Sequence, residues 1–196
     1  MSFIGSLTLF IKEVKRFLKV YQQTIVAPAF TSLLFLLVIN VAIEDRTNYK
    51  FNYIDFLAPG LIIMGMMQNS FANTSSSLLS SKVAGNIVDL LMPPFKVNEI
   101  IIVYCIAAII RAILVGILTF LIMMPFINFD FLNFYNLVIF SILGSMLLAL
   151  IGLVAGIWAE KFDNMSAITN FVITPLTFLS GTFYSIDKLK EPFYTI

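Results

Sequence analysis

The sequence predicts an all-α protein, a polytopic bundle of transmembrane helices that forms a single domain over residues 1–196. Of its residues, 60% are hydrophobic and only 12% are charged, and the mean hydropathy is +0.97. A soluble domain is about half apolar and about a quarter charged, so this chain has too few polar side chains to cover a water-soluble surface. Its apolar runs also lack the alternation that a transmembrane β-barrel requires. We therefore expect an integral membrane protein made of helices.

The first expected element is an amphipathic helix over residues 1–22. Apolar side chains recur in it at helical spacing, and basic side chains fall largely on the other side. Such a helix suits the headgroup plane of a bilayer, where its cations would face anionic lipid. A simple topology anchor would account for the same pattern. The apolar residues are Phe3, Ile4, Leu7, Phe10, Ile11, Val14, Phe17, Leu18 and Tyr21, and the basic ones are Lys12, Lys15, Arg16 and Lys19.

Five membrane spans are expected after this helix, at about 24–43, 56–78, 101–124, 135–158 and 166–185. A helix needs about 20 residues to cross the hydrocarbon core of a bilayer. Each span lies in a stretch without Asp, Glu, Lys or Arg, except that the third contains Arg111. The composition of these stretches therefore supports five crossings.

The distribution of basic residues predicts the orientation. Lys and Arg accumulate on the cytoplasmic side of membrane proteins, which favours a cytoplasmic N-terminus. We expect a multi-pass protein of the inner (plasma) membrane. With this orientation the inner segments carry Lys12, Lys15, Arg16, Lys19, Lys82, Lys96 and Lys161, and the outer segments carry Arg46, Lys50, Lys188 and Lys190.

The first inner loop, at about 79–99, is the most informative segment. A short amphipathic helix is expected from about Lys82 to Leu91, because the pair Pro93-Pro94 would end it. Its apolar side could pack on the bundle or fill a groove on a cytoplasmic partner. From the spacing alone, a surface loop with a structural turn is the favoured interpretation.

The order of motifs along the chain resembles the permease subunits of type-2 ATP-binding-cassette exporters. The second span opens with Phe56-Leu57-Ala58-Pro59-Gly60-Leu61, and Lys82, Asn86-Ile87 and Asp89-Leu90-Leu91 follow, with a proline shortly after. The segment Pro175-Leu176-Thr177-Phe178-Leu179-Ser180-Gly181-Thr182-Phe183-Tyr184-Ser185-Ile186 is similar to the one that closes the fifth span in that family. The resemblance covers essentially the whole chain.

This resemblance implies a permease that forms a translocation pathway with a second copy of itself and rests on a separate ATPase subunit. ATP and Mg²⁺ would be bound by that ATPase, so no cofactor is expected in this chain. The family has six spans, so a chain that stops at Ile196 would be C-terminally incomplete. The ATPase-coupling helix, carried over by position, would comprise Lys82, Val83, Gly85, Asn86, Ile87, Asp89, Leu90 and Leu91.

No catalytic motif accompanies these features. The sequence lacks the Gly-x-x-x-x-Gly-Lys-Ser/Thr loop that cradles nucleotide phosphates, so any ATP hydrolysis must come from a partner. Histidine is absent and Cys105 is the only cysteine, which excludes a zinc site, a disulfide and an imidazole base within the chain. The formal charge of +1 gives no reason to expect nucleic-acid binding. We therefore predict no enzyme activity and no metal site.

Polar residues inside the spans are the candidates for a translocation path. Asn69, Asn73 and Ser76 fall on one face of the second span. Arg111 lies near the middle of the third span, where a cation needs water or a partner such as a carbonyl or an Asn. Interhelical hydrogen bonding explains the three polar residues of the second span without any transport role. Arg111 could equally snorkel or bond to a neighbouring carbonyl or Asn. In the fourth span, Gly152-x-x-x-Gly156 predicts close helix packing.

Two other functional classes remain open from the residues alone. A secondary transporter or channel that works without an ATPase would also be a helical bundle, but proton and sodium relays usually depend on intramembrane carboxylates or histidines. A membrane scaffold could tether a cytoplasmic protein through the same inner loop. A P-loop ATPase in the neighbouring reading frame would favour the exporter over both.

Overall fold

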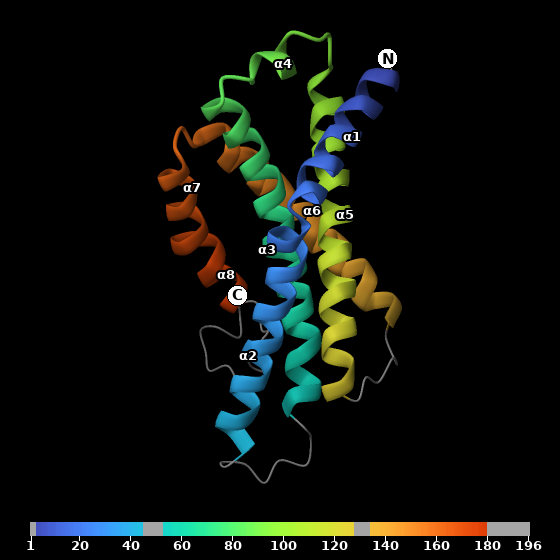
Figure 1. Cartoon of the computed structure of the whole chain (residues 1–196), viewed down its shortest axis with the longest axis vertical. Coiled ribbons are helices and arrows are strands. Elements are labelled where there is room, and N and C mark those ends of the chain that lie inside the picture. Colours follow the sequence, from blue (N-terminus) through green and yellow to red (C-terminus); the bar gives the residue numbers. More distant parts are fainter. Residues whose placement is uncertain (1–2, 45–52, 128–133, 180–196) are drawn as a thin grey trace, which may run out of the picture.

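The computed structural model describes residues 3–44, 53–127 and 134–179, and all regular structure within these ranges is helical (Figure 1). The long helices run alternately up and down the long axis of the molecule. The elements in chain order are α1 (Phe3–Lys19), η1 (Gln22–Val26), α2 (Ala27–Glu44), α3 (Tyr53–Val83), α4 (Val88–Leu91), α5 (Val97–Met123), η2 (Met124–Phe126), α6 (Phe134–Trp158), α7 (Phe162–Ile168), η3 (Thr169–Ile173) and α8 (Thr174–Leu179).

Helix α3 is the centre of the bundle, and it packs most extensively against α6 and α5. Gly152 and Gly156 let the backbone of α6 approach α3 closely. At this contact the Ser70 hydroxyl donates to the carbonyl of Ser145 at 2.7 Å, and the Thr74 hydroxyl donates to the carbonyl of Ala149 at 2.9 Å. The close packing predicted for the glycine pair is confirmed.

Three of the described helical segments are long and apolar enough to cross a membrane: Gln22–Val41, Val97–Phe126 and Tyr135–Trp158. They match the predicted spans at 24–43, 101–124 and 135–158. The predicted span at 56–78 lies within α3, which is 31 residues long but carries many polar side chains. Residues 166–179 of the last predicted span are helical, and 180–185 lie outside the described residues. The all-helical fold is confirmed, whereas the number of five spans stays a prediction.

Helix α1 is amphipathic as predicted, and one stripe of it packs on the bundle. Its buried side chains are Leu9, Glu13 and Phe17, while Ile4 and Leu7 are exposed on the outer surface. Lipid is as apolar as a protein core, so an apolar face gains little by turning inwards in a membrane. The side of α1 that packs on the bundle therefore includes a charged residue, Glu13.

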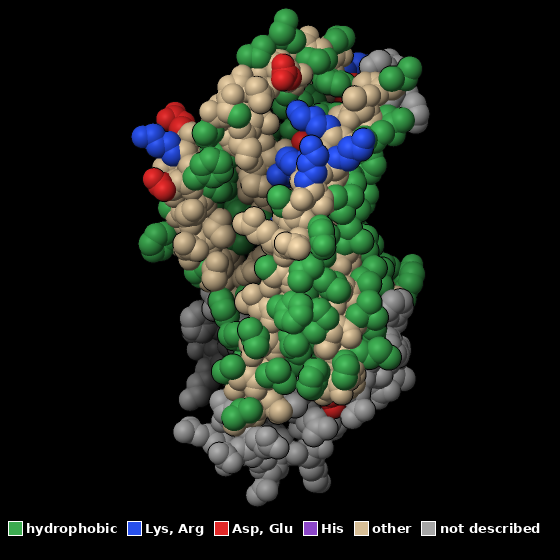
Figure 2. Space-filling model, in the orientation of Figure 1, with side chains coloured by type: hydrophobic (Ala, Val, Ile, Leu, Met, Phe, Trp, Pro, Cys, Tyr) green, Lys and Arg blue, Asp and Glu red, His purple; other side chains and the backbone are tan. Residues whose placement is uncertain are grey.

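The outer surface supports the membrane assignment. In Figure 2 hydrophobic side chains cover much of the lower two thirds of the described surface, and a group of Lys and Arg side chains lies higher up, over α1. Lys12, Lys15 and Lys19 are exposed there. These three lysines keep the predicted outward direction, whereas Arg16 does not.

Candidate functional site

The polar face of α3 receives an arginine from each of two neighbouring helices. Arg111 of α5 donates from Nη2 to Oδ1 of Asn69 at 2.9 Å. Arg16 of α1 donates from Nη2 to Oδ1 of Asn73 at 3.0 Å and to its backbone carbonyl at 2.8 Å. Because Asn69 and Asn73 are one helical turn apart, the two guanidinium groups lie on successive turns of α3.

Arg111 has the type of partner that the sequence predicted, an Asn on an adjacent span. Its exposed fraction is only 7%. Its position in α5 is about 21 Å from the first residue of the helix at 1.5 Å per residue. Burial of a cation at this depth is costly unless its donors are satisfied, and Asn69 supplies one acceptor.

Arg16 was not among the predicted site residues. Its Nε donates to Oε2 of Glu13 at 3.2 Å, and Glu13 is 1% exposed. Its Nη1 donates to the Ser76 hydroxyl at 3.4 Å. The sequence held one signal for this contact, because Glu13 is the only acidic residue in α1 and precedes Arg16 by one helical turn.

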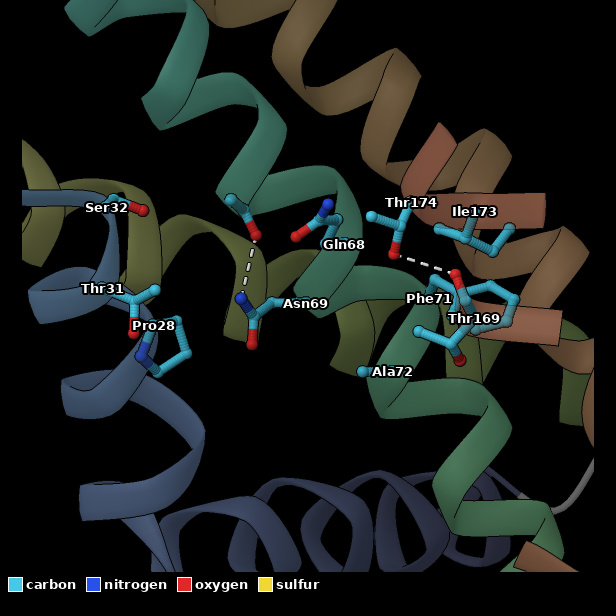
Figure 3. Close-up of a pocket in the computed structure, with 11 residues that line it drawn as sticks. Pro28, Thr31, Ser32, Gln68, Asn69, Phe71, Ala72, Thr169, Ile173 and Thr174 are labelled. Carbon is cyan, nitrogen blue, oxygen red and sulfur yellow. Dashed lines mark hydrogen bonds between the residues drawn. The ribbon is translucent and has the colours of Figure 1, made fainter. Parts of the chain in front are cut away.

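A cavity of about 360 Å³ lies between α2, α3 and the η3–α8 segment. Figure 3 shows Pro28, Thr31 and Ser32 of α2 on one side, Thr169, Ile173 and Thr174 on the other, and Gln68 and Asn69 of α3 between them. The lining is rich in hydroxyl and amide groups, and none of the described residues that form it is charged. Asn69 therefore faces the cavity while its Oδ1 accepts from Arg111.

Both outer walls of the cavity adjoin a π-helical turn. The turn η1 ends at Val26, directly before the first residue of α2, and η3 ends at Ile173, directly before α8. The Thr174 hydroxyl donates to the Thr169 carbonyl at 2.9 Å across η3. Single π-turns are rare in proteins and occur frequently at functional sites. Two π-helical turns beside one polar cavity therefore make this region of the bundle a candidate functional site.

The inner loop differs from its predicted form. The expected helix from Lys82 to Leu91 is not continuous, because α3 runs on to Val83 and only α4 is helical afterwards. Gly85 breaks the helix, since its φ of +73° is the left-handed conformation that ends helices. Asn86 and Asp89 are exposed, and Ile87 packs partly against the bundle.

Lys82 also has a role that the sequence did not predict. Its Nζ donates to the backbone carbonyls of Ile157 and, at 2.9 Å, Ala159. These carbonyls lie at the C-terminal end of α6, where no further helical turn can satisfy them and a cation is favourable. Lys82 therefore links the end of α3 to the end of α6 within the chain.

Gly85→Ala is expected to lower the stability of the protein by about 1 kcal/mol, because an L-residue disfavours the left-handed region. There is no neighbouring atom within 4 Å to clash with the added methyl group, so backbone strain is the only cost. Thermal unfolding in detergent would measure it. Gly85→Asn should cost less, since Asn tolerates this conformation. An Ala variant as stable as the parent would contradict the assigned backbone geometry.

Two adjacent leucines show how α4 sits on the bundle. Leu90 is 6% exposed and packs with residues of α1, α3 and α5, whereas Leu91 is 71% exposed. Val88 and Met92 are exposed as well. One side of α4 is thus attached to the bundle, and the other presents apolar side chains outwards.

Comparison with known proteins shows which family this chain belongs to. Residues 6–196 match the family described as "ABC-2 type transporter". This chain belongs to the ABC-2 type transporter family. It is a membrane permease subunit of an ABC transporter, as the resemblance in its sequence implied.

Relatives of this ABC-2 permease carry the same type of name. The chain is 36% identical over 185 residues to the "Inner membrane transport permease YadH" of Escherichia coli (strain K12), which covers 93% of this chain and 72% of the relative. The protein of the same name from Shigella flexneri matches equally well. No solved structure matches this chain. Family membership implies an ABC ATPase as a general partner.

Proposed function

We propose that this permease forms a translocation pathway with a second copy of itself and exports its substrate across the inner membrane. A separate ATPase subunit would bind ATP and Mg²⁺ and would drive the change of access. The N-terminus would be cytoplasmic, which places the loop 79–99 on the side of the ATPase. Membership in the ABC-2 family supports an ABC ATPase as the partner.

The observation that carries the coupling proposal is the outer side of α4. Val88, Leu91 and Met92 are exposed, and they lie in the loop at one end of the bundle (Figure 1). Apolar side chains that are exposed together on a cytoplasmic loop are typical of a binding surface. Since α4 follows directly on α3, force applied to it would reach the polar face of α3 at Ser76, Asn73 and Asn69.

Leu91→Asp is expected to weaken binding of the ATPase to the full-length permease by about tenfold, because the charge would be desolvated at the contact. The thermal midpoint of the permease should not change, since Leu91 is exposed. Co-purification and ATP hydrolysis by the reconstituted complex would measure the effect.

Leu90→Ala is the matched control, because Leu90 is adjacent but buried. It should destabilise the permease by about 2 kcal/mol while leaving the outer side of α4 intact. Undiminished ATPase binding and transport in the Leu91 variant would refute the coupling assignment. Transport that continues without any ATPase would favour a secondary transporter or channel.

A further inference from the structure

The polar core around α3 contains more positive than negative charge. Arg16 has a carboxylate partner in Glu13, but no ion pair to Arg111 occurs among the described residues. Both arginines are nonetheless held on the same face of α3 through Asn73 and Asn69. The core therefore has an uncompensated cation, and a negative charge brought near Arg111 would be stabilised in this low-dielectric environment.

The same core has an excess of hydrogen-bond donors. Nε of Arg111 and Nδ2 of Asn73 are buried without a partner among the described residues. The orientation of the Asn73 amide is fixed, because its Oδ1 accepts from Arg16. A group rich in acceptor oxygens, such as a phosphate or a carboxylate, complements such donors, whereas a cationic or donor-rich group does not.

Asn69 separates this cation from the cavity. Its side chain lines the cavity, and its Nδ2 donates to the Gly65 carbonyl at 2.9 Å while Oδ1 accepts from Arg111. Asn69 thus contacts both the cavity and the Arg111 guanidinium. Gln68, Thr31 and Thr174 provide further polar groups around the same space (Figure 3).

The cavity is also suited to an amphiphile. It lies on the surface between α2 and the η3–α8 segment, and exposed apolar side chains such as Phe30, Leu34 and Leu176 belong to the helices that form its walls. Figure 2 shows a hollow beside α7 that apolar side chains border on the lower side. A polar headgroup in the cavity would leave an alkyl chain free to lie along these walls.

We propose that this cavity binds the anionic headgroup of an amphiphilic substrate and that Arg111 determines its charge specificity. Asn69 holds the guanidinium in the resting state and releases it to the headgroup when the cavity is occupied. The inference rests on the proposed transport function, since it assigns a substrate class to that pathway. A purely structural arginine clamp between α5 and α3 is the competing explanation.

Protection of an introduced thiol tests the proposal directly. The full-length permease carrying Thr31→Cys, in phosphatidylcholine nanodiscs, is labelled with N-ethylmaleimide in the presence of dodecyl phosphate, dodecyl maltoside or dodecyltrimethylammonium. Peptide mass spectrometry separates label at position 31 from label on Cys105, which is buried. Dodecyl phosphate should halve the labelling rate at a concentration about tenfold lower than that of the other two probes, since a charge-assisted hydrogen bond contributes about this much.

Two substitutions in the same background separate charge recognition from a structural clamp. Arg111→Gln should remove the preference for dodecyl phosphate. Asn69→Asp should remove it too, because the new carboxylate would neutralise Arg111 in place while keeping the clamp and the fold. Lys15→Gln, which removes an exposed cation on α1, is the control and should leave the preference unchanged.

Three results of the labelling experiment would contradict charge recognition by Arg111. Equal protection by all three probes, protection by none, or a preference that survives in a folded Asn69→Asp variant would overturn the proposal. Binding of the ATPase is measured on the same samples. If the permease binds no ATPase but keeps the charge preference, the proposed coupling is refuted and the substrate class stands. If it binds the ATPase but has no charge preference, only the substrate class is refuted.

Discussion

Gly152→Ala is expected to destabilise the bundle by about 3 kcal/mol, the upper end of the usual cost of overpacking. A methyl group at this position would lie 2.6 Å from the Phe71 carbonyl oxygen and would also collide with the Thr74 hydroxyl. Both neighbours belong to α3, and the Phe71 carbonyl is main chain that cannot rotate away. Helices α3 and α6 would have to separate, which would also lengthen the hydrogen bond from Thr74 to Ala149.

Other glycines of α6 supply a graded control for this result. At Gly156 the added methyl group would lie 3.0 Å from Cβ of Leu78, and at Gly144 it would lie 3.2 Å from Sδ of Met67. The methionine side chain is flexible and can move, so Gly144→Ala should cost less than about 1 kcal/mol. The thermal midpoint in detergent should therefore be lowest for Gly152→Ala, intermediate for Gly156→Ala and highest for Gly144→Ala. A Gly152 variant as stable as the Gly144 variant would contradict the packing of α3 on α6.

Arg16→Met is expected to cost about 3 kcal/mol. The substitution leaves Glu13, at 1% exposure, without its cation, and loss of one partner from a buried ion pair is strongly destabilising. The estimate is the lower end of the usual range, since the Arg16 side chain is itself 30% exposed. The Asn73 carbonyl and carboxamide would also lose their donor.

The double variant Glu13→Leu/Arg16→Met tests whether the isolated carboxylate causes this loss. It should regain at least half of the lost stability, because an apolar pair can replace a buried ion pair at little cost. Lys15→Met removes a neighbouring but exposed cation and should have almost no effect. If the Lys15 and Arg16 variants had equal midpoints, the inward direction of Arg16 would be wrong.

Part of the candidate site was predictable from the sequence. Helical periodicity put Asn69, Asn73 and Ser76 on one face of α3, and the structure places arginine contacts on that face. The cost of a buried cation required a polar partner for Arg111, and an Asn provides it. Small residues four apart predicted where α6 would approach α3. Each of these inferences depends on a property of one helix alone.

Other parts of the site depended on which helices are neighbours. Arg16 looked like one of four lipid-facing cations, and only the position of α1 against α5 and α3 turned it inwards. Lys82 looked like a residue of the loop helix, but the end of α6 lies within its reach. The cavity is formed by residues more than a hundred positions apart, such as Thr31 and Thr174. No periodicity along one segment contains this information.

The sequence by itself determined that the chain is a helical membrane protein of the ABC-2 permease type and which of its residues are costly to bury. These properties follow from composition and local spacing, because the bilayer requires each span to satisfy its own backbone hydrogen bonds. Only the tertiary structure decided which face of α1 turns inwards, where Gly85 ends α3 and what Arg111 contacts. Between helices in a membrane the hydrophobic effect hardly discriminates among faces, so close packing and a few polar contacts select the arrangement.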